Sequence, residues 1–376
     1  MNKFAGRAGI QQRVLPFYRV DFFDTLAKRC QAGLEIFAGD PRPDEGIKSV
    51  DRLQFARLTK GRNLHLFPIN SPFYICWQTG SKAWLQEKQP DALVVEANPR
   101  YLRTRSLVNW MHKKNRVVIG WGLGAPEIRG SFSRIRAHHR KIFLLSLDAV
   151  ISYSNKGAKE YISLGIPESK VFVAPNAAAT KTLSTPPYRG ITIDGKLCVL
   201  FVGRLQKRKR VDNLIRACAL LPDEIKPRLI IVGDGSVKHE LIDLAEVIYP
   251  ETDFPGALYG QDLEEQFLQA DLFVLPGTGG LAVQQAMSYG LPVIMEEGDG
   301  TQSELIREKN GWVLPTNDLN ALKFTLLQAL TDVPKLRMMG NESYKIIKEE
   351  INIERMADAF VNVFSKVVPA YQQGNE

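Results

Sequence analysis

A glycine-rich stretch near the C-terminus, Pro276-Gly-Thr-Gly-Gly280, has the composition of an anion-binding loop. It follows an apolar run short enough for a buried strand, Leu272–Leu275, and precedes a helical pattern from Leu281 to Tyr289. Glycines at a helix N-terminus leave backbone N–H groups uncovered, and the positive end of the helix dipole favours an anion there. A phosphate is the expected ligand, although the same glycines could simply turn a strand into a helix in an unrelated α/β protein.

A run of cationic residues follows another expected strand, Leu197–Val202. The segment Gly203-Arg-Leu-Gln-Lys-Arg-Lys-Arg-Val211 carries five Lys or Arg residues. Open α/β sheets bind ligands beyond the carboxyl ends of their strands, and Arg and Lys together can neutralise a diphosphate. For this run alone, a solvated basic loop is the alternative. A diphosphate site is favoured because two phosphate-binding features fall at strand ends of what we expect to be one sheet.

The elements that position these residues form two α/β series. The chain of 376 residues exceeds the size at which one hydrophobic core stops growing, which predicts two domains. Apolar runs alternate with helical patterns in each half, as in parallel sheets covered by helices. In the first half the expected strands are Ile10–Leu15, Leu34–Ala38, Leu64–Ile69, Ala92–Glu96, Val117–Gly120, Ala149–Ser152 and Val171–Ala174. In the second half the expected strands are Leu197–Val202, Arg228–Val232, Ala257–Tyr259, Leu272–Leu275 and Pro292–Met295.

A stretch rich in small residues and proline separates the two series and predicts the domain boundaries. We expect residues 1–176 to form an N-terminal Rossmann-like domain and residues 177–196 to form a linker. Residues 197–352 should form a second Rossmann-like domain. A last helix begins near Ile353, and we expect the segment 353–376 to pack back on the N-terminal domain.

The positive charge belongs to the first half alone. Residues 1–180 carry 28 Lys and Arg against 14 Asp and Glu, whereas the remainder carries 21 against 27. This asymmetry predicts an anionic partner for the first half: a phosphorylated acceptor, an acidic membrane surface or a nucleic acid. The segment Arg129–Leu145 could form a helix with an apolar stripe of Phe132, Ile135 and Phe143 flanked by cations, which would suit a membrane interface. The stripe could equally pack on the sheet.

The four cysteines, Cys30, Cys76, Cys198 and Cys218, show no metal-ligand spacing and fall in apolar patterns. We therefore expect neither a disulfide nor a metal site. No apolar run approaches the roughly 18 residues of a membrane span, and the N-terminus lacks the apolar centre of a secretory signal. The expected location is the cytoplasm.

Five motifs of the second half carry a more specific signal. They are, in order, FVGRLQKRKRVDNLIRA, RLIIVGDGSVKHEL, ADLFVLPGTGGLAVQQAMSYGLPVI, SELI and NGWVL. In this order and spacing they resemble the nucleotide-sugar domain of the retaining GT-B glycosyltransferases of family 4. DAVISYSNKGAKEYISLGIPESKVFVAPNA is similar to the end of that family's first domain, so the resemblance covers roughly Leu147 to the C-terminus. In residues 1–146 the alternation of strand and helix patterns agrees with the fold of that family. The segment Val14–Phe23 resembles the start of some bacterial members.

The resemblance implies a GT-B fold, in which two Rossmann-like domains have parallel sheets that face each other across a cleft. It implies transfer of a hexose-type sugar, with retention, from a nucleotide-diphosphate sugar that is UDP- or GDP-linked. The acceptor would be a glycan or a lipid-diphosphate, as in bacterial polysaccharide biosynthesis, at the inner face of the plasma membrane. No Asp-x-Asp pair follows a strand, which favours transfer without a metal.

By the same resemblance, Arg204 and Lys209 match the Arg and Lys that hold the donor diphosphate, and we expect them to be the catalytic residues. The family pattern E-x-x-x-x-x-x-x-E falls on Gly277 and Gln285 here. A Gln amide can still hydrogen-bond a ribose, whereas Gly277 offers only its backbone. The expected donor-binding residues are Gly203, Gly233, Gly279, Gly280, Leu281 and Gln285.

On the first domain, the expected acceptor-side residues are Arg19, Trp121 and Gly124. Leu123 stands near the place where many relatives carry a histidine, and it cannot do acid–base work. In this family the leaving phosphate itself is thought to take the acceptor proton while Arg and Lys hold its charge. The main task of the protein would then be to stabilise the departing diphosphate.

Other classes of protein explain less of the sequence. The changes at Gly277 and Gln285 leave open a catalytically impaired nucleotide-sugar-binding protein, and another GT-B enzyme such as an epimerase is a further alternative. A dinucleotide oxidoreductase is disfavoured because no G-x-G-x-x-G follows an early strand. A nucleic-acid-binding protein would account for the basic half but not for the motifs of the second half, so we expect no nucleic-acid partner.

Overall fold

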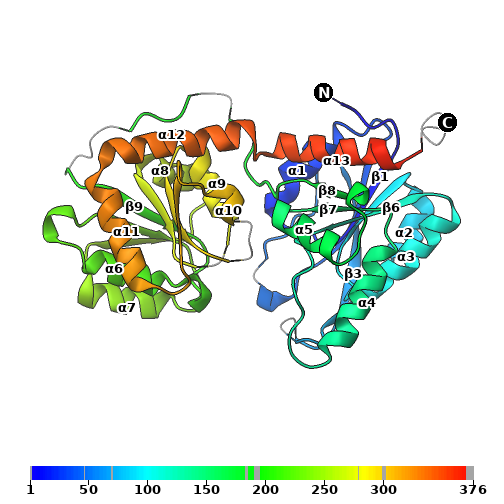
Figure 1. Cartoon of the computed structure of the whole chain (residues 1–376), viewed down its shortest axis with the longest axis horizontal. Coiled ribbons are helices and arrows are strands. Elements are labelled where there is room, and N and C mark those ends of the chain that lie inside the picture. The colour runs from blue at the N-terminus through cyan, green and yellow to red at the C-terminus, as the bar shows by residue number, and fades with distance from the viewer. Residues whose placement is uncertain are drawn as a thin grey trace. The chain divides into compact units, whose positions relative to one another are not determined.

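The computed structural model describes residues 2–45, 47–68, 71–182, 185–189, 195–277, 279–298 and 302–369. The chain divides into two compact units, which Figure 1 shows in the colours of the sequence. Unit 1 comprises the chain up to Ala178 together with the C-terminal segment from Ile353, and unit 2 comprises Ala179–Asn352. The C-terminal helix therefore belongs to the unit that contains the N-terminus.

Unit 1 is built on an eight-stranded sheet of order β4-β3-β2-β1-β5-β6-β7-β8. Its strands are β1 (Ala8–Val14), β2 (Leu34–Gly39), β3 (Arg57–Leu66), β4 (Ile75–Thr79), β5 (Ala92–Glu96), β6 (Val117–Gly122), β7 (Ala149–Ser152) and β8 (Val171–Val173). All described pairs are parallel except β3 with β4, which form an antiparallel hairpin at the edge. The inner strands are buried along nearly their whole length because helices cover both faces.

The edge hairpin corrects one sequence expectation. A strand was expected at Leu64–Ile69, whereas β3 begins seven residues earlier, at Arg57, and ends at Leu66; Ile69 lies outside the described residues. Strand β4 was not expected at all. Side chains of β3 alternate between exposed and half-buried positions, so the strand lacks the continuous apolar run that reveals an inner strand.

The helices of unit 1 form two layers with separate apolar clusters. They are α1 (Val20–Ala27), α2 (Ser81–Lys88), α3 (Leu102–Lys113), α4 (Ser133–Leu145), α5 (Asn155–Ser163) and α13 (Ile353–Val367). One cluster joins α1 and α13, where the rings of Phe22 and Phe360 lie 5.1 Å apart. The other joins α2, α3 and α4 to the opposite face of the sheet. Arg29 fixes α13 further through an ion pair of 2.5 Å with Asp358.

Unit 2 is a six-stranded parallel sheet of order β11-β10-β9-β12-β13-β14. Its strands are β9 (Cys198–Val202), β10 (Arg228–Val232), β11 (Thr252–Gly256), β12 (Leu272–Leu275), β13 (Val293–Glu296) and β14 (Gly311–Leu314). Its helices are α6 (Val211–Ala219), α7 (Lys238–Ile248), α8 (Gly260–Gln269), α9 (Leu281–Ser288), α10 (Gln302–Leu305), α11 (Leu319–Thr331) and α12 (Val333–Glu349). The strand expected at Ala257–Tyr259 is wrong, because β11 ends at Gly256, where a positive φ of 82° turns the chain.

The strand order of unit 2 defines where a ligand can bind. Strand order reverses between β9 and β12, which pair directly through Leu200 and Phe273. In doubly wound sheets, the crevice outside the carboxyl ends of the strands at this switch point receives the ligand. The cationic loop follows β9 and the glycine loop follows β12, so both lie at that point.

Candidate functional site

The loop after β9 brings its cations to the switch point in a compact turn. Gly203 donates its N–H to the Val232 carbonyl at 3.0 Å, which ties the loop to β10. Gly233 lies so close to this loop that an added Cβ would be 1.9 Å from the Gly203 carbonyl oxygen, so only glycine fits there. Lys207–Lys209 then form a turn of 3-10 helix before α6. Arg204 is exposed, and Lys209 is 9% exposed.

Lys209 meets the glycine loop that follows β12. A Cβ added at Gly277 would lie 2.4 Å from the Arg208 carbonyl oxygen, so the two loops touch through their backbones. A Cβ added at Gly279 would lie 2.5 Å from Lys209 Nζ. The ammonium group therefore lies against the residue that precedes Gly280, the N-cap of α9. The structure thus brings together the basic loop and the glycine loop that the sequence singled out.

The first backbone N–H groups of α9 have no acceptor within the helix, as at the start of any α-helix. Gly280 at the N-cap has no side chain that could accept them, and Gly279 adopts a positive φ of 143° that favours glycine. Leu281 is the first residue of the helix, and Gln285 follows one turn later in a half-buried position. Backbone donors and a cation together form an anion site of the kind that binds a phosphate.

Burial makes the Lys209 ammonium easier to deprotonate. Burial, together with the positive charges of Arg208 and Arg204, lowers the pKa of Lys209 to about 8. A diphosphate bound between these groups would reverse the effect, because an opposite charge favours the protonated form.

Arg210, the last cation of the run, has a structural role. Arg210 forms an ion pair with Glu296, a buried residue at the end of β13 that the sequence analysis did not single out. Burial raises the pKa of Glu296, while a backbone N–H of Asn317 and the Arg210 charge oppose that rise. A carboxylate directly after an apolar strand is the signal that could have identified it. Arg210 therefore anchors the loop to β13.

The three acceptor-side residues expected on unit 1 have different surroundings. Arg19 is buried, lies 5.0 Å above the Trp121 ring, and donates to the Ala177 carbonyl at 3.2 Å and to Asn176 Oδ1. These contacts give Arg19 a structural function in holding the segment that leads out of unit 1. Trp121 and Gly124 line a cavity, which Arg19 does not.

That cavity, of about 1070 Å³, lies at the carboxyl ends of β5 and β6 in unit 1. Its described lining combines aromatic and apolar side chains with cations and two carboxylates. The lining residues include Phe67, Phe73, Tyr74, Glu96, Arg100, Arg105, Trp121, Gly124, Glu127, Arg129, Arg136, Arg140, Tyr153 and Tyr161. Neither Glu96 nor the aromatic residues of the β3–β4 hairpin could be recognised as site residues from the sequence pattern. A smaller cavity of about 450 Å³ in unit 2 is lined by other residues than the expected donor-binding ones.

The apolar stripe expected along Arg129–Leu145 is divided in the structure. Phe143 is buried in the core between α4 and the sheet. Phe132 precedes α4 with a positive φ of 56°, is 62% exposed, and contacts Phe73 with ring centroids 6.0 Å apart. Ile135 is also exposed. The helix therefore packs through its C-terminal end and presents apolar side chains at its N-terminal end.

Within the described residues, no three His, Cys, Asp or Glu side chains are grouped as metal ligands would be. The four cysteines are buried free thiols. No described helix is both long enough and apolar enough to cross a membrane.

Comparison with known proteins finds a family match within the second half of the chain. Residues 190–346, less than half of the chain, match the model of glycosyl transferases group 1. The two Rossmann-like units have the GT-B fold.

Curated relatives match over part of their length. An uncharacterized glycosyltransferase of Methanocaldococcus jannaschii is 29% identical over 181 residues, which are 46% of this chain and 46% of that protein. A GDP-mannose-dependent alpha-mannosyltransferase of Mycobacterium tuberculosis is 37% identical over 128 residues, 33% of this chain and 32% of that protein. The chain thus spans at most about half the length of these relatives.

Solved structures match over nearly the whole chain. A sucrose-phosphate synthase from Thermosynechococcus elongatus has a TM-score of 0.72 at 17% identity, over 96% of this chain and 98% of that one. The protein HepE of Anabaena, in complex with UDP, has a TM-score of 0.69 at 15% identity, over 97% and 100%. At these identities the likeness shows the fold.

Proposed function

We propose that this protein is a glycosyltransferase that moves a sugar from a nucleotide-diphosphate sugar to a glycan acceptor. The observation that carries the proposal is the contact between Lys209 Nζ and Gly279 at the start of α9. This anion site lies in the domain that matches the group 1 glycosyl transferases. A relative that uses GDP-mannose and a structural neighbour that holds UDP support a nucleotide donor.

In this proposal, Arg204 and Lys209 hold the donor diphosphate together with the N–H groups of Gly280 and Leu281. Charge develops on the diphosphate as the glycosidic bond to the sugar breaks, and preorganised donors stabilise such charge most effectively. Gln285 hydrogen-bonds the ribose. A side chain at Gly277 would collide with Arg208, so the sugar is oriented by backbone groups and not by a carboxylate at this position.

We further propose that the donor sugar is a hexose and that transfer retains its anomeric configuration without a metal ion. The cations of the β9 loop would supply the charge that a metal supplies elsewhere. The proposed donor-binding groups are cations, backbone N–H groups and an amide, and none of them is a carboxylate. In this proposal the leaving phosphate itself takes the acceptor proton, and transfer with retention is consistent with such a site.

For the acceptor, we propose a lipid-diphosphate-linked glycan that is used at an anionic membrane surface. The basic balance of the first half and the exposed Phe132 and Ile135 support this proposal. Apolar side chains beside cations suit the boundary between headgroups and acyl chains. The protein would work at the inner face of the plasma membrane.

Calorimetric titration with UDP and with GDP tests the donor site. We expect one of them to bind, and Lys209→Ala to weaken that binding by about 10- to 1,000-fold, since charge-assisted hydrogen bonds to a diphosphate are lost. Lys207→Ala is the matched control, because Lys207 is an exposed cation of the same loop. Equal affinity of wild type and Lys209→Ala would contradict the assignment.

One observation favours a second candidate, a nucleotide-sugar-binding protein with impaired catalysis. The backbone contact at Gly277 excludes the carboxylate that the family pattern has at this position. Donor turnover separates the two candidates. If a purified nucleotide sugar binds but is neither hydrolysed nor transferred to any acceptor glycan, the binding protein is the better description.

A further inference from the structure

The cavity of unit 1 is lined by side chains of different burial and chemistry. Trp121 and Tyr161 are buried and Glu96 is half-buried, whereas Phe67 and Phe73 are exposed. Among the described residues, five arginines line the cavity, and three of them lie on α4 or just before it: Arg100, Arg105, Arg129, Arg136 and Arg140. A molecule that fills this cavity would meet both the Glu96 carboxylate and several guanidinium groups.

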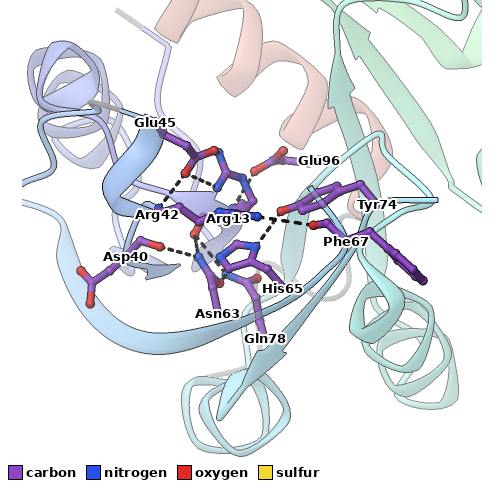
Figure 2. A network of polar contacts seen from close by, with 10 residues as sticks. All are labelled: Arg13, Asp40, Arg42, Glu45, Asn63, His65, Phe67, Tyr74, Gln78 and Glu96. Atoms are coloured by element: carbon purple, nitrogen blue, oxygen red, sulfur yellow. Dashed lines mark hydrogen bonds and ion pairs between the residues drawn. The ribbon is translucent and has the colours of Figure 1, made fainter. Parts of the chain in front are cut away.

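Glu96 is held in place by the end of β1. Its Oε1 accepts the backbone N–H of Arg13 at 2.6 Å, as Figure 2 shows. The guanidinium of Arg13 pairs through both terminal nitrogens with Glu45 at 2.8 Å. The carboxylate of Glu96 is therefore oriented by a backbone donor and not covered by the guanidinium.

The strand end that carries this donor is itself fixed from its other side. Asn63 Nδ2 donates to the Arg13 carbonyl at 2.7 Å, and Gln78 Nε2 donates to Asn63 Oδ1 at 3.0 Å. These contacts tie β1 to the β3–β4 hairpin (Figure 2). A functional group placed on such supported strand ends keeps its geometry, which is what selective recognition of a hydroxyl requires.

The surroundings of Glu96 leave its charge poorly solvated. Burial raises the pKa of Glu96, and the Arg13 N–H, the Arg13 charge and Tyr101 oppose that rise. A poorly solvated carboxylate gains from a further hydrogen-bond donor, so a hydroxyl group of a bound molecule would stabilise Glu96.

We propose that Glu96 selects the acceptor by accepting a hydrogen bond from a hydroxyl of its sugar, while the arginines of the cavity bind a phosphate on the same molecule. The acceptor class is thus a glycosyl phosphate or diphosphate. This inference rests on the proposed function and adds to it the residue that recognises the acceptor sugar. Guanidinium groups match phosphate geometry, and a carboxylate matches a hydroxyl donor.

Soluble sugar 1-phosphates test the inference, because they carry the sugar and the phosphate without a lipid. The probes are the 1-phosphates of glucose, galactose and N-acetylglucosamine, titrated in the presence of saturating UDP or GDP so that the unit 2 site is filled. We expect at least one to bind the wild type, and Glu96→Ala to weaken it by about 10- to 100-fold, the factor for a lost hydrogen bond to a charged group.

Two comparisons make the result specific to the hydroxyl. Inorganic phosphate should bind the wild type and Glu96→Ala equally, because it meets the arginines alone. Among deoxy analogues of the bound sugar phosphate, we expect one that binds the wild type more weakly than the parent compound does. The same analogue and the parent compound should bind Glu96→Ala with equal affinity, because the variant has already lost the hydrogen bond to that hydroxyl. Such coupling marks a direct contact. Glu96→Gln keeps an oxygen for the Arg13 N–H and shows whether the fold survives the loss of charge.

The matched control is Glu87→Gln, which changes a carboxylate of α2 that does not line the cavity. Glu87 is exposed and pairs with Lys88 at 2.8 Å, so we expect wild-type affinity. Wild-type affinity in Glu96→Ala, or failure of all three sugar phosphates to bind the wild type, overturns the inference. A wild type that binds neither UDP nor GDP would instead contradict the proposed function.

Discussion

The protonation of Lys209 should control nucleotide affinity. Burial is the largest cause that lowers the pKa of Lys209 to about 8. Lys209 is therefore cationic below about pH 8 and loses its charge above it. The nucleotide phosphates are fully ionised above about pH 7 because their last pKa is near 6. We therefore expect affinity for UDP or GDP to be constant near pH 7 and to fall as the pH rises past about 8, in calorimetric titrations up to about pH 9.

Lys209→Arg supplies the control at this position. Its guanidinium stays charged throughout this range, so the decline above pH 8 should disappear even if the affinity itself changes. A decline of the same size in Lys209→Arg would show that another group titrates. This outcome would leave the diphosphate site in place but remove Lys209 as the origin of its pH dependence.

At the scale of elements, the Arg13–Glu45 ion pair connects the end of β1 to the short 3-10 helix Pro43–Glu45. The side chains are 11% and 6% exposed. Arg13→Ala would remove the countercharge of the buried Glu45 carboxylate, which still accepts the Arg42 N–H at 2.8 Å, so we expect unit 1 to lose about 3 kcal/mol of stability in urea unfolding. Arg129→Ala, which breaks an exposed pair with Glu127, should cost less than about 1 kcal/mol. Equal losses would show that burial of the pair is unimportant.

Most elements of both sheets could be predicted from the sequence because their strands are continuous apolar runs. The convergence of Lys209 with Gly279 could also be expected, since both follow strands at the switch point of one sheet. The edge hairpin could not, because β3 alternates polar and half-buried residues. Glu96 escaped notice for a related reason: a carboxylate after an apolar strand looks solvated until the neighbouring strands show what surrounds it.

At the scale of the whole molecule, the asymmetric charge predicts salt-dependent binding to anionic membranes. Sedimentation with phosphatidylglycerol vesicles should recover the protein, and phosphatidylcholine vesicles should not, because each cation near an anionic surface contributes about 1 kcal/mol. Added salt should weaken the binding. Phe132→Ser combined with Arg134→Glu should reduce it, since both residues are exposed at the start of α4.

Phe324→Ser is the matched control for this experiment. Phe324 is 68% exposed, but it lies on α11 in unit 2, where the charge balance is acidic. The Phe324→Ser variant should therefore sediment with phosphatidylglycerol vesicles as the wild type does. Recovery of the wild type in the supernatant with both kinds of vesicle would mean that the basic half serves a soluble acceptor.

Because α13 belongs to unit 1, the ribosome must make all of unit 2 before unit 1 can close its core. Phe360 and Phe364 fill the space beside Phe4 and Phe22, and they are synthesised after unit 2. At typical rates of synthesis, the first part of unit 1 therefore waits on the order of tens of seconds with an apolar face uncovered. Unit 2 has no such delay, since its whole sequence is contiguous. Exposure of this apolar face during synthesis is thus set by the length of unit 2, which separates the two parts of unit 1 in the sequence.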